Sequence, residues 1–313
     1  MTNVYKINLF SFYVHDKDHL NGKKEEIDRR EEYKTHCTSH KILGWGWHRK
    51  NAREVKTLDE YKADYGKSRS LTIACNQIRD MKAGDFCWTY VSREWYLGKV
   101  EGDFKFNTPD SNYPEFGMYR TCKWLKISDS DLVPGVICAH SKKEATVLHV
   151  SSDTAFISYC EYLYKNRVST EKIKGFNFWT LAHTDDLEDL VGIYLQTIGY
   201  YVFPSTNKQG TKDYEFKLIH KDTHKEALIQ CKNNADIPLD NLEKTYSNEE
   251  IYILGIKDNN RPKYTEFWEM GWQSKDGRIK IFDAQKIEKW ARDNKSILPK
   301  RIQNFLQLSQ PSD

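Results

Sequence analysis

Short runs of aromatic and β-branched residues, separated by turn-forming residues, dominate the first half of the chain. Such runs are typical of β-strands, and the glycines and prolines between them are typical of turns. Two polar stretches, Lys24 to Tyr33 and Thr57 to Tyr65, carry a few apolar residues spaced for a helix with one buried face. The pattern predicts a small β-rich domain with a helix or two. Its predicted strands include Val4 to Val14, Gly84 to Val91, Trp95 to Val100 and Ala145 to Val150.

The pattern changes after Ser151, where apolar residues recur at helical spacing. The run from Asp185 to Ile198 ends at Gly199, a residue type that commonly closes helices. Helices and strands then alternate, which predicts a mixed α/β domain. We therefore expect an α+β protein with two domains, residues 1–170 and 171–313, and a seam near residues 165–178. The further elements expected are helices at Thr154 to Tyr164 and Leu239 to Tyr246, and strands at Tyr200 to Pro204, Tyr214 to Ile219, Ala227 to Gln230 and Ile251 to Ile256.

The composition is that of a folded protein without a membrane span. Of 313 residues, 39% are hydrophobic and 13% are aromatic, and the mean hydropathy is −0.77. This disfavours disorder and suffices for two modest cores. No apolar run approaches the ~18 residues of a membrane helix, and the segment from Met1 to Phe12 lacks the features of a signal peptide. We expect a cytoplasmic protein.

The spacing of the cysteines and the distribution of charge limit the kinds of site that the chain can form. The seven cysteines include no Cys-x-x-Cys pair, which argues against a disulfide framework or a zinc ribbon and predicts small, buried residues. His36, Cys37 and His40 are residue types that bind zinc, but the nearby sequence offers no second pair of ligands to complete a zinc site. The net charge of +3 divides into +5 for residues 1–175 (29 Lys and Arg, 24 Asp and Glu) and −2 for residues 176–313 (19 and 21). An acidic second half suits a region that gathers carboxylates around a cation.

Three pieces of the second half together predict a phosphodiesterase site. Glu188 lies in the first turns of an expected helix, and Asp213 follows a glycine-containing loop at the mouth of a strand. Gln230 and Lys232 end another strand, and alternation places them on one face. Phosphodiester hydrolysis needs a divalent metal to activate water and a cation to offset the charge of the transition state. Glu188, Asp213 and Gln230 are oxygen ligands suited to Mg²⁺, and Lys232 is the expected cation.

These motifs resemble those of the PD-(D/E)xK nucleases, specifically the Mrr-like restriction endonucleases. Glu188 with the Gly199-Tyr200 turn fits the first family motif, Gly210 to Asp213 the second, and Gln230-Cys-Lys232 the third. The resemblance spans about residues 180–290, ending in a strand and helix expected at Ile279 to Trp290. The loop before Asp213 reads Lys-Gln-Gly-Thr-Lys instead of the family's double-glycine turn. The resemblance implies a restriction-endonuclease-like mixed sheet flanked by helices, an endonuclease using Mg²⁺ (or Mn²⁺), and a homodimer.

Simpler interpretations of the same residues are open. Gln-x-Lys is common on strands, so Lys232 could be a surface lysine, and acids at a helix start complement the helix dipole. The latter explanation suffices for Asp185, Asp186 and Asp189. Glu215, on the same strand face as Asp213, is either a further ligand or a solvated residue.

Aromatic residues of the first half suggest a pocket for a base. In Gly44-Trp45-Gly46-Trp47 the glycines leave room for a ligand beside the rings. Trp88 and Tyr90 add two rings on a predicted strand, and aromatic walls hold flipped or single-stranded bases by stacking. Arg49 and Arg120 are the expected phosphate contacts. Alternatively, Trp88 and Tyr90 point into the core of this domain, and the same alternative applies to Tyr96 and Trp124.

This segment resembles EVE and PUA-like domains, small β-barrels whose members bind modified bases or RNA. Gly44 to Trp47, the Gly84-Asp85 turn, the strand from Arg120 to Trp124 and Leu132-Val-Pro-Gly135 carry the resemblance. The two resemblances together imply a DNA endonuclease directed by a modified-base reader, as in modification-dependent restriction and phage defence. The alternatives are a non-catalytic nucleic-acid or nucleotide sensor with a nuclease-like fold, and an RNA-directed nuclease. Four lysines of this half form either a nucleic-acid track or a solvated face. They are Lys99, Lys105, Lys123 and Lys126.

Overall fold

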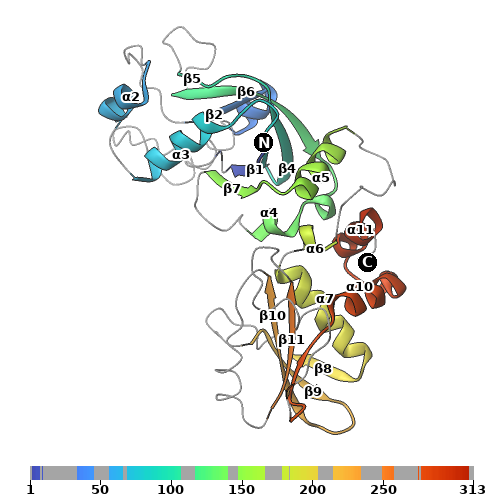
Figure 1. Cartoon of the computed structure of the whole chain (residues 1–313). Helices are drawn as coiled ribbons and strands as arrows, with labels where there is room; N and C mark the ends of the chain where they lie inside the picture. The colour runs from blue at the N-terminus through green and yellow to red at the C-terminus, as the bar shows by residue number, and fades with distance from the viewer. Residues whose placement is uncertain are drawn as a thin grey trace, which may run out of the picture. The chain divides into compact units, whose positions relative to one another are not determined.

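A computed structural model of the chain describes residues 2–7, 9, 34–45, 56–65, 69–106, 117–139, 147–165, 178–182, 184–203, 214–233, 249–256, 274 and 276–309. It divides into two compact units. Unit 1 comprises Met1–Val133 and Ile137–Ser169, and unit 2 comprises Pro134–Val136 and Thr170–Asp313. Each unit combines a sheet with helices, so the protein is of the α+β class (Figure 1). The helices predicted at Lys24 to Tyr33 and Leu239 to Tyr246 lie outside the described residues.

Unit 1 is built on a curled sheet that forms half of a barrel (Figure 1). Its strands are β1 (Val4–Ile7), β2 (Ile42–Trp45), β3 (Phe86–Val91), β4 (Glu94–Val100), β5 (Lys105–Phe106), β6 (Met118–Ile127) and β7 (Val147–Ser151). Their order is β2-β6-β4-β3-β1-β7, with β5 also paired to β6. β1 runs parallel to β3, and the other described pairings are antiparallel.

Helices cover both faces of this sheet. On the inner face, α3 (Arg69–Asp80) packs its small residues Ala74 and Cys75 and the larger Ile78 into the core. On the outer face lies α5 (Thr154–Lys165), whose buried side chains include Phe156, Tyr159, Cys160 and Leu163. The remaining helical segments of unit 1 are residues 34–39, α2 (Leu58–Tyr65), η1 (Ser130–Leu132) and α4 (Gly135–Ala139), of which α4 begins in unit 2. All seven cysteines are free thiols, and all but Cys138 are buried, as predicted.

Unit 2 contains a five-stranded mixed sheet with the order β12-β11-β10-β9-β8. Its strands are β8 (Tyr200–Phe203), β9 (Phe216–His220), β10 (Glu226–Asn233), β11 (Glu250–Ile256) and β12 (Ile279–Ile281). β8, β9 and β10 are successively antiparallel, whereas β10, β11 and β12 are parallel. The predicted mixed sheet is therefore present in this unit.

The helix α7 (Thr184–Thr197) lies along this sheet and contacts β8 and β10 (Figure 1). Its buried side chains Leu187, Leu190, Val191 and Leu195 recur at helical spacing. The helix ends at Gly199, whose φ of +105° is a left-handed conformation that glycine adopts at low cost. Tyr200 begins β8 at once, so the chain reverses direction there. The first turn of α7 is therefore placed at the carboxyl end of β8.

The described residues of unit 2 include three further helices. They are α6 (Phe178–Leu181), α10 (Ala284–Asp293) and α11 (Lys300–Leu308), with the short η5 (Lys295–Ile297) between the last two. Arg292 of α10 bonds the buried Glu288 and donates to the carbonyl of Leu306 at 2.7 Å, which ties α10 to the end of α11. Among the described residues, no helix has the length and apolar character needed to cross a membrane.

Candidate active site

The central strand β10 positions the predicted Gln230 and Lys232. Gln230 pairs with Ile253 of β11, and Lys232 pairs with Gly255, so the two residues occupy alternate positions along β10. Gln230 is 3% exposed. The position of Lys232 follows from its backbone in β10. Both lie near the carboxyl ends of the parallel strands β10 and β11, where the chain leaves the sheet.

Glu215 is the residue that the structure brings to Gln230. The backbone N–H of Glu215 donates to the carbonyl of Ile229 at 2.7 Å, which continues the β9–β10 pairing to this end of the sheet. The side-chain Nε2 of Gln230 donates to Oε1 of Glu215, also at 2.7 Å. Glu215 therefore binds the amide of a candidate site residue.

This bond fixes the orientation of the Gln230 amide. A carboxylate only accepts hydrogen bonds, so the NH₂ group must face Glu215 and the carbonyl oxygen must face away from it. A second, weaker contact of Nε2 reaches the carbonyl of Cys231 at 3.4 Å. No hydrogen bond reaches Gln230 Oε1 from the part of the chain that the structure describes. An oriented amide oxygen is a suitable ligand for a hard cation.

Asp213, the expected central ligand, lies outside the described residues. Its neighbour in the chain, Tyr214, begins the described segment that leads into β9. Glu215 follows Asp213 by two residues and already contacts Gln230.

Glu188 lies at the same end of the sheet as Gln230, but on the side that α7 covers. It lies in the first turns of α7, and the reversal at Gly199 directs these turns toward the carboxyl ends of β8 and β10 (Figure 1). α7 packs on the face of Tyr252, as the ring contacts of Tyr194 and Tyr252 with Phe282 show. Gln230 projects from the other face. Within the described residues, Glu188 and Gln230 make no hydrogen bond to each other.

One acid of the α7 start has a structural partner. Asp186 is 2% exposed, and its Oδ1 lies 2.9 Å from Nε of Arg301 on α11. A buried ion pair of this kind joins two helices and is costly to break on one side only. Asp186 therefore stabilises the packing of α7 on α11, in addition to the dipole role expected for it.

The donor chemistry of the site fits Mg²⁺ in part. Glu188, Glu215 and Gln230 offer carboxylate and amide oxygens, the ligand types that Mg²⁺ prefers. The described residues contain no cluster of three or more His, Cys, Asp or Glu side chains arranged to hold a metal.

In unit 1, the structure separates the two aromatic residues predicted on β3. Trp88 is fully buried, on the face of β3 where its near neighbour Phe86 contacts Tyr164 of α5. A base could stack on Trp88 only if α5 moved away, so Trp88 occupies a core position, in contrast to its predicted place in an open pocket. Tyr90 is 43% exposed, and its ring lies 4.9 Å from that of Trp95. Tyr90 thus offers an accessible ring face.

Of the other two predicted pocket tryptophans, one lies within the described residues. Trp45 ends β2, where its backbone pairs with Met118 of β6. Trp47 and the predicted phosphate contact Arg49 lie outside the described residues.

Arg120, the second predicted phosphate contact, has a structural role. Its guanidinium is buried and donates to the carbonyls of Ile78 at 2.8 Å, Arg79 at 2.5 Å and Gly102 at 2.8 Å. Ile78 and Arg79 belong to the last turn of α3, where backbone carbonyls lack helical partners. Burial lowers the pKa of Arg120, but the guanidinium remains a cation suited to a helix C-terminus. Arg120 is therefore a cap for α3 and is not placed to bind phosphate.

Sequence reasoning missed a buried cation on β1. Lys6 is 7% exposed and donates to the carbonyl of Ile137 at 2.8 Å, with its ammonium 5.3 Å from the Trp95 ring. Burial lowers the pKa of Lys6 to about 8. A single lysine in a strand pattern carries no signal that distinguishes this position from an exposed one.

The sequence did indicate Glu215 as a candidate ligand, because strand alternation puts it on the same face as Asp213.

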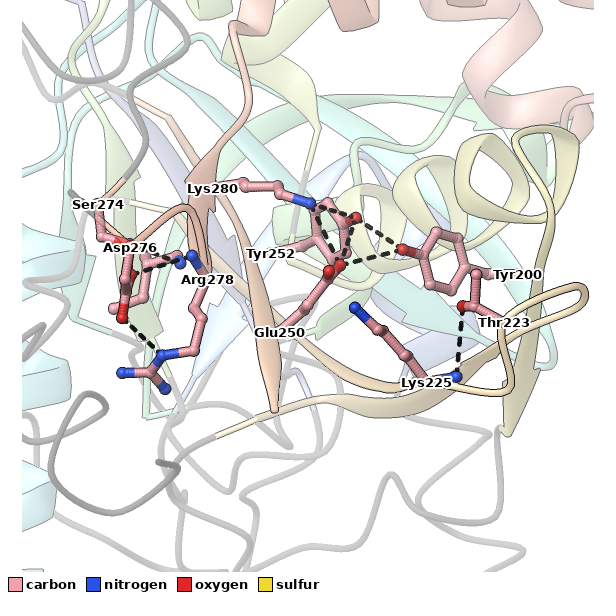
Figure 2. A network of polar contacts seen from close by, with 10 residues as sticks. Tyr200, Thr223, Lys225, Glu250, Tyr252, Ser274, Asp276, Arg278 and Lys280 are labelled. Carbon is pink, nitrogen blue, oxygen red and sulfur yellow. Dashed lines mark hydrogen bonds and ion pairs between the residues drawn. The ribbon is translucent and has the colours of Figure 1, made fainter. Parts of the chain in front are cut away.

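A second polar network lies at the other end of the unit 2 sheet (Figure 2). Glu250 Oε2 accepts from the hydroxyl of Tyr200 at 3.2 Å, the hydroxyl of Tyr252 at 3.1 Å and Lys280 Nζ at 3.2 Å. The two hydroxyls are 2.8 Å apart. Burial raises the pKa of Glu250, but Lys280 and the two hydroxyls outweigh it and leave a net lowering. The network joins β8 to β11 and β12 across the sheet.

No protein-family model matches this chain, and no curated protein matches it.

Proposed function

We propose that unit 2 is a metal-dependent nuclease and that unit 1 directs it to nucleic acid. The observation that carries the proposal is the Gln230–Glu215 hydrogen bond. It orients an amide oxygen at the end of a central strand, two residues before Lys232 in the chain. This arrangement supports the motif interpretation better than an exposed, unanchored Gln-x-Lys would.

The proposed site divides the chemistry among its residues. Asp213 and Gln230 would hold Mg²⁺ (or Mn²⁺), with Glu215 fixing the amide of Gln230, and Glu188 would reach the same ion around the end of the sheet from the first turns of α7. A bound divalent cation supplies an activated water and polarises a phosphoryl oxygen. Lys232 would place its ammonium against the negative charge that develops on the phosphate during attack.

The substrate that we propose is DNA carrying a modified base. Tyr90 supports a base-reading role for unit 1, because its exposed ring beside Trp95 can stack on a base. By analogy with the two resemblances, the whole chain would act in modification-dependent restriction and phage defence. A homodimer would supply the two sites needed to cut both strands.

A cleavage comparison tests this proposal. Wild type and Asp213→Ala would be incubated with plain phage DNA and with cytosine-modified phage DNA, in Mg²⁺ and in EDTA. We expect cleavage of the modified DNA alone, abolished by EDTA and by Asp213→Ala. Tight binding without cleavage under every condition would favour a non-catalytic sensor, and cleavage of RNA alone would reassign the substrate.

A further inference from the structure

The structure separates the four lysines that the sequence grouped in unit 1. Lys99 of β4 and Lys123 of β6 are directly opposite each other in the antiparallel register. Lys126 lies three residues further along β6, so it projects to the other face, where it forms an ion pair with Glu94. Lys105 lies on the short strand β5, opposite Tyr119. Only Lys99 and Lys123, of these four, form a cross-strand pair of cations.

This pair carries an uncompensated charge. Within the described residues, neither Lys99 nor Lys123 forms an ion pair with a carboxylate. The acidic residue nearest in register is Glu101, which lies opposite Thr121. Like charges directly opposite each other destabilise a β-sheet. An anion bound between the two ammonium groups would convert this repulsion into attraction.

Two aromatic side chains lie beside the pair. The ammonium of Lys99 lies 5.3 Å from the Phe86 ring. The hydroxyl of Tyr164, near the end of α5, donates to the backbone carbonyl of Lys123 at 3.1 Å, and its ring lies 6.0 Å from that of Phe86. The Phe86 ring limits where Lys99 can place its charge, and the Tyr164 hydroxyl holds the backbone of Lys123 in position. A cation that is held in this way loses less conformational freedom on binding an anion than a free lysine would.

We propose that Lys99 and Lys123 form a clamp for a backbone phosphate of nucleic acid. The proposal rests on the proposed function and assigns the backbone contact of unit 1 to this pair. Lysines act on phosphate as point charges and carry no sequence information, so the clamp would position the strand while other residues read the base. The net charge of +5 in residues 1–175 (29 Lys and Arg, 24 Asp and Glu) favours a polyanion at this unit.

The salt dependence of binding tests the clamp. The full-length protein in EDTA would be titrated with a labelled 20-base-pair DNA duplex, and with an RNA duplex of that sequence, over a range of salt concentrations. Each neutralised phosphate contributes about one to the slope of log K against log salt. We expect the slope to fall by about one in the double variant, and by no more than that in Lys99→Gln or in Lys123→Gln. Lys126→Gln is the matched control on the same strand, and its slope should equal that of wild type.

The thermal melting of the same variants separates binding from folding. Because the pair repels itself, the double variant should melt no lower than wild type while binding more weakly. An unchanged slope in the double variant, or an equal loss in Lys126→Gln, would overturn the clamp and leave the proposed nuclease intact. A wild-type protein that binds neither DNA nor RNA would overturn both.

Discussion

The side-chain amide of Gln230 donates to the carboxylate of Glu215 at 2.7 Å, from the central strand of the unit 2 sheet to the residue preceding its antiparallel neighbour. The contact joins the residue before β9 to β10, at the open end of the β-hairpin that these two strands form. It also gives Glu215 a specific task, because a carboxylate at this position leaves the amide only one orientation.

Glu215→Gln tests Glu215 as a positioning residue. An amide at position 215 can accept or donate, so Gln230 would no longer be held with its oxygen toward the metal. Loss of such supporting contacts typically weakens metal binding about 10- to 100-fold. We expect the Mg²⁺ concentration for half-maximal cleavage to rise by about tenfold or more, with little change in rate at saturating Mg²⁺. Glu226→Gln, a matched change at the far end of β10, should leave the metal dependence unchanged, and an equal response of the two variants would refute the role.

Arg120→Met tests the structural role of Arg120. The variant leaves three backbone carbonyls without their donor, two of them at the end of α3. We expect it to lower the free energy of unfolding by about 3 kcal/mol, measured by urea denaturation. Lys123→Met, an exposed change on the same strand, should cost little. If Arg120 bound phosphate instead, the folded variant would show a reduced salt slope in DNA binding and near-normal stability.

Tyr90→Ala tests the accessible ring of unit 1. Stacking of one base on an aromatic side chain is worth about 1–3 kcal/mol. We therefore expect modified DNA to bind about 5- to 150-fold more weakly in EDTA, measured by fluorescence anisotropy. Tyr201→Ala removes another exposed tyrosine, on β8 of unit 2, and serves as the control. Wild-type affinity in Tyr90→Ala would rule out this ring as a base contact.

The Glu250 network predicts a loss of stability in acid (Figure 2). The pKa of Glu250 is lowered in the folded state, so its ionised form stabilises the fold above the unfolded-state pKa. That contribution is lost as the pH falls through the folded-state pKa. Glu250→Gln should reduce the free energy of unfolding by about 1 kcal/mol near neutral pH, and by progressively less below about pH 4. A difference between the two proteins that stays constant with pH would show that the carboxylate charge is not involved.

Local patterns predicted those features that depend on nearby residues. Gly199 correctly marked the end of the helix α7, and the Gly84-Asp85 signal corresponds to a turn. Gly84 there has a φ of +97°, and Asp85 accepts from two backbone N–H groups. The helix α3 was missed because its buried face consists largely of small residues such as Ala74 and Cys75. Such residues give a weak apolar pattern.

Contacts between distant parts of the chain were not predictable in this way. Arg120 meets carbonyls about forty residues earlier in the sequence, and its charge alone suggested a phosphate contact. Trp88 is covered by α5, which begins far beyond β3 in the sequence. No local pattern distinguishes a tryptophan that faces a later helix from one that faces solvent.

Single-turnover cleavage by Lys232→Ala tests the central claim most directly. Removing a charged group that stabilises a transition state typically costs about 100- to 1,000-fold in rate. The measurement would use labelled modified DNA in saturating Mg²⁺, with Lys225→Ala, an exposed lysine just before β10, as the control. The account predicts a loss of about 100-fold or more for Lys232→Ala and wild-type rates for Lys225→Ala. Cleavage by Lys232→Ala at the wild-type rate would contradict it.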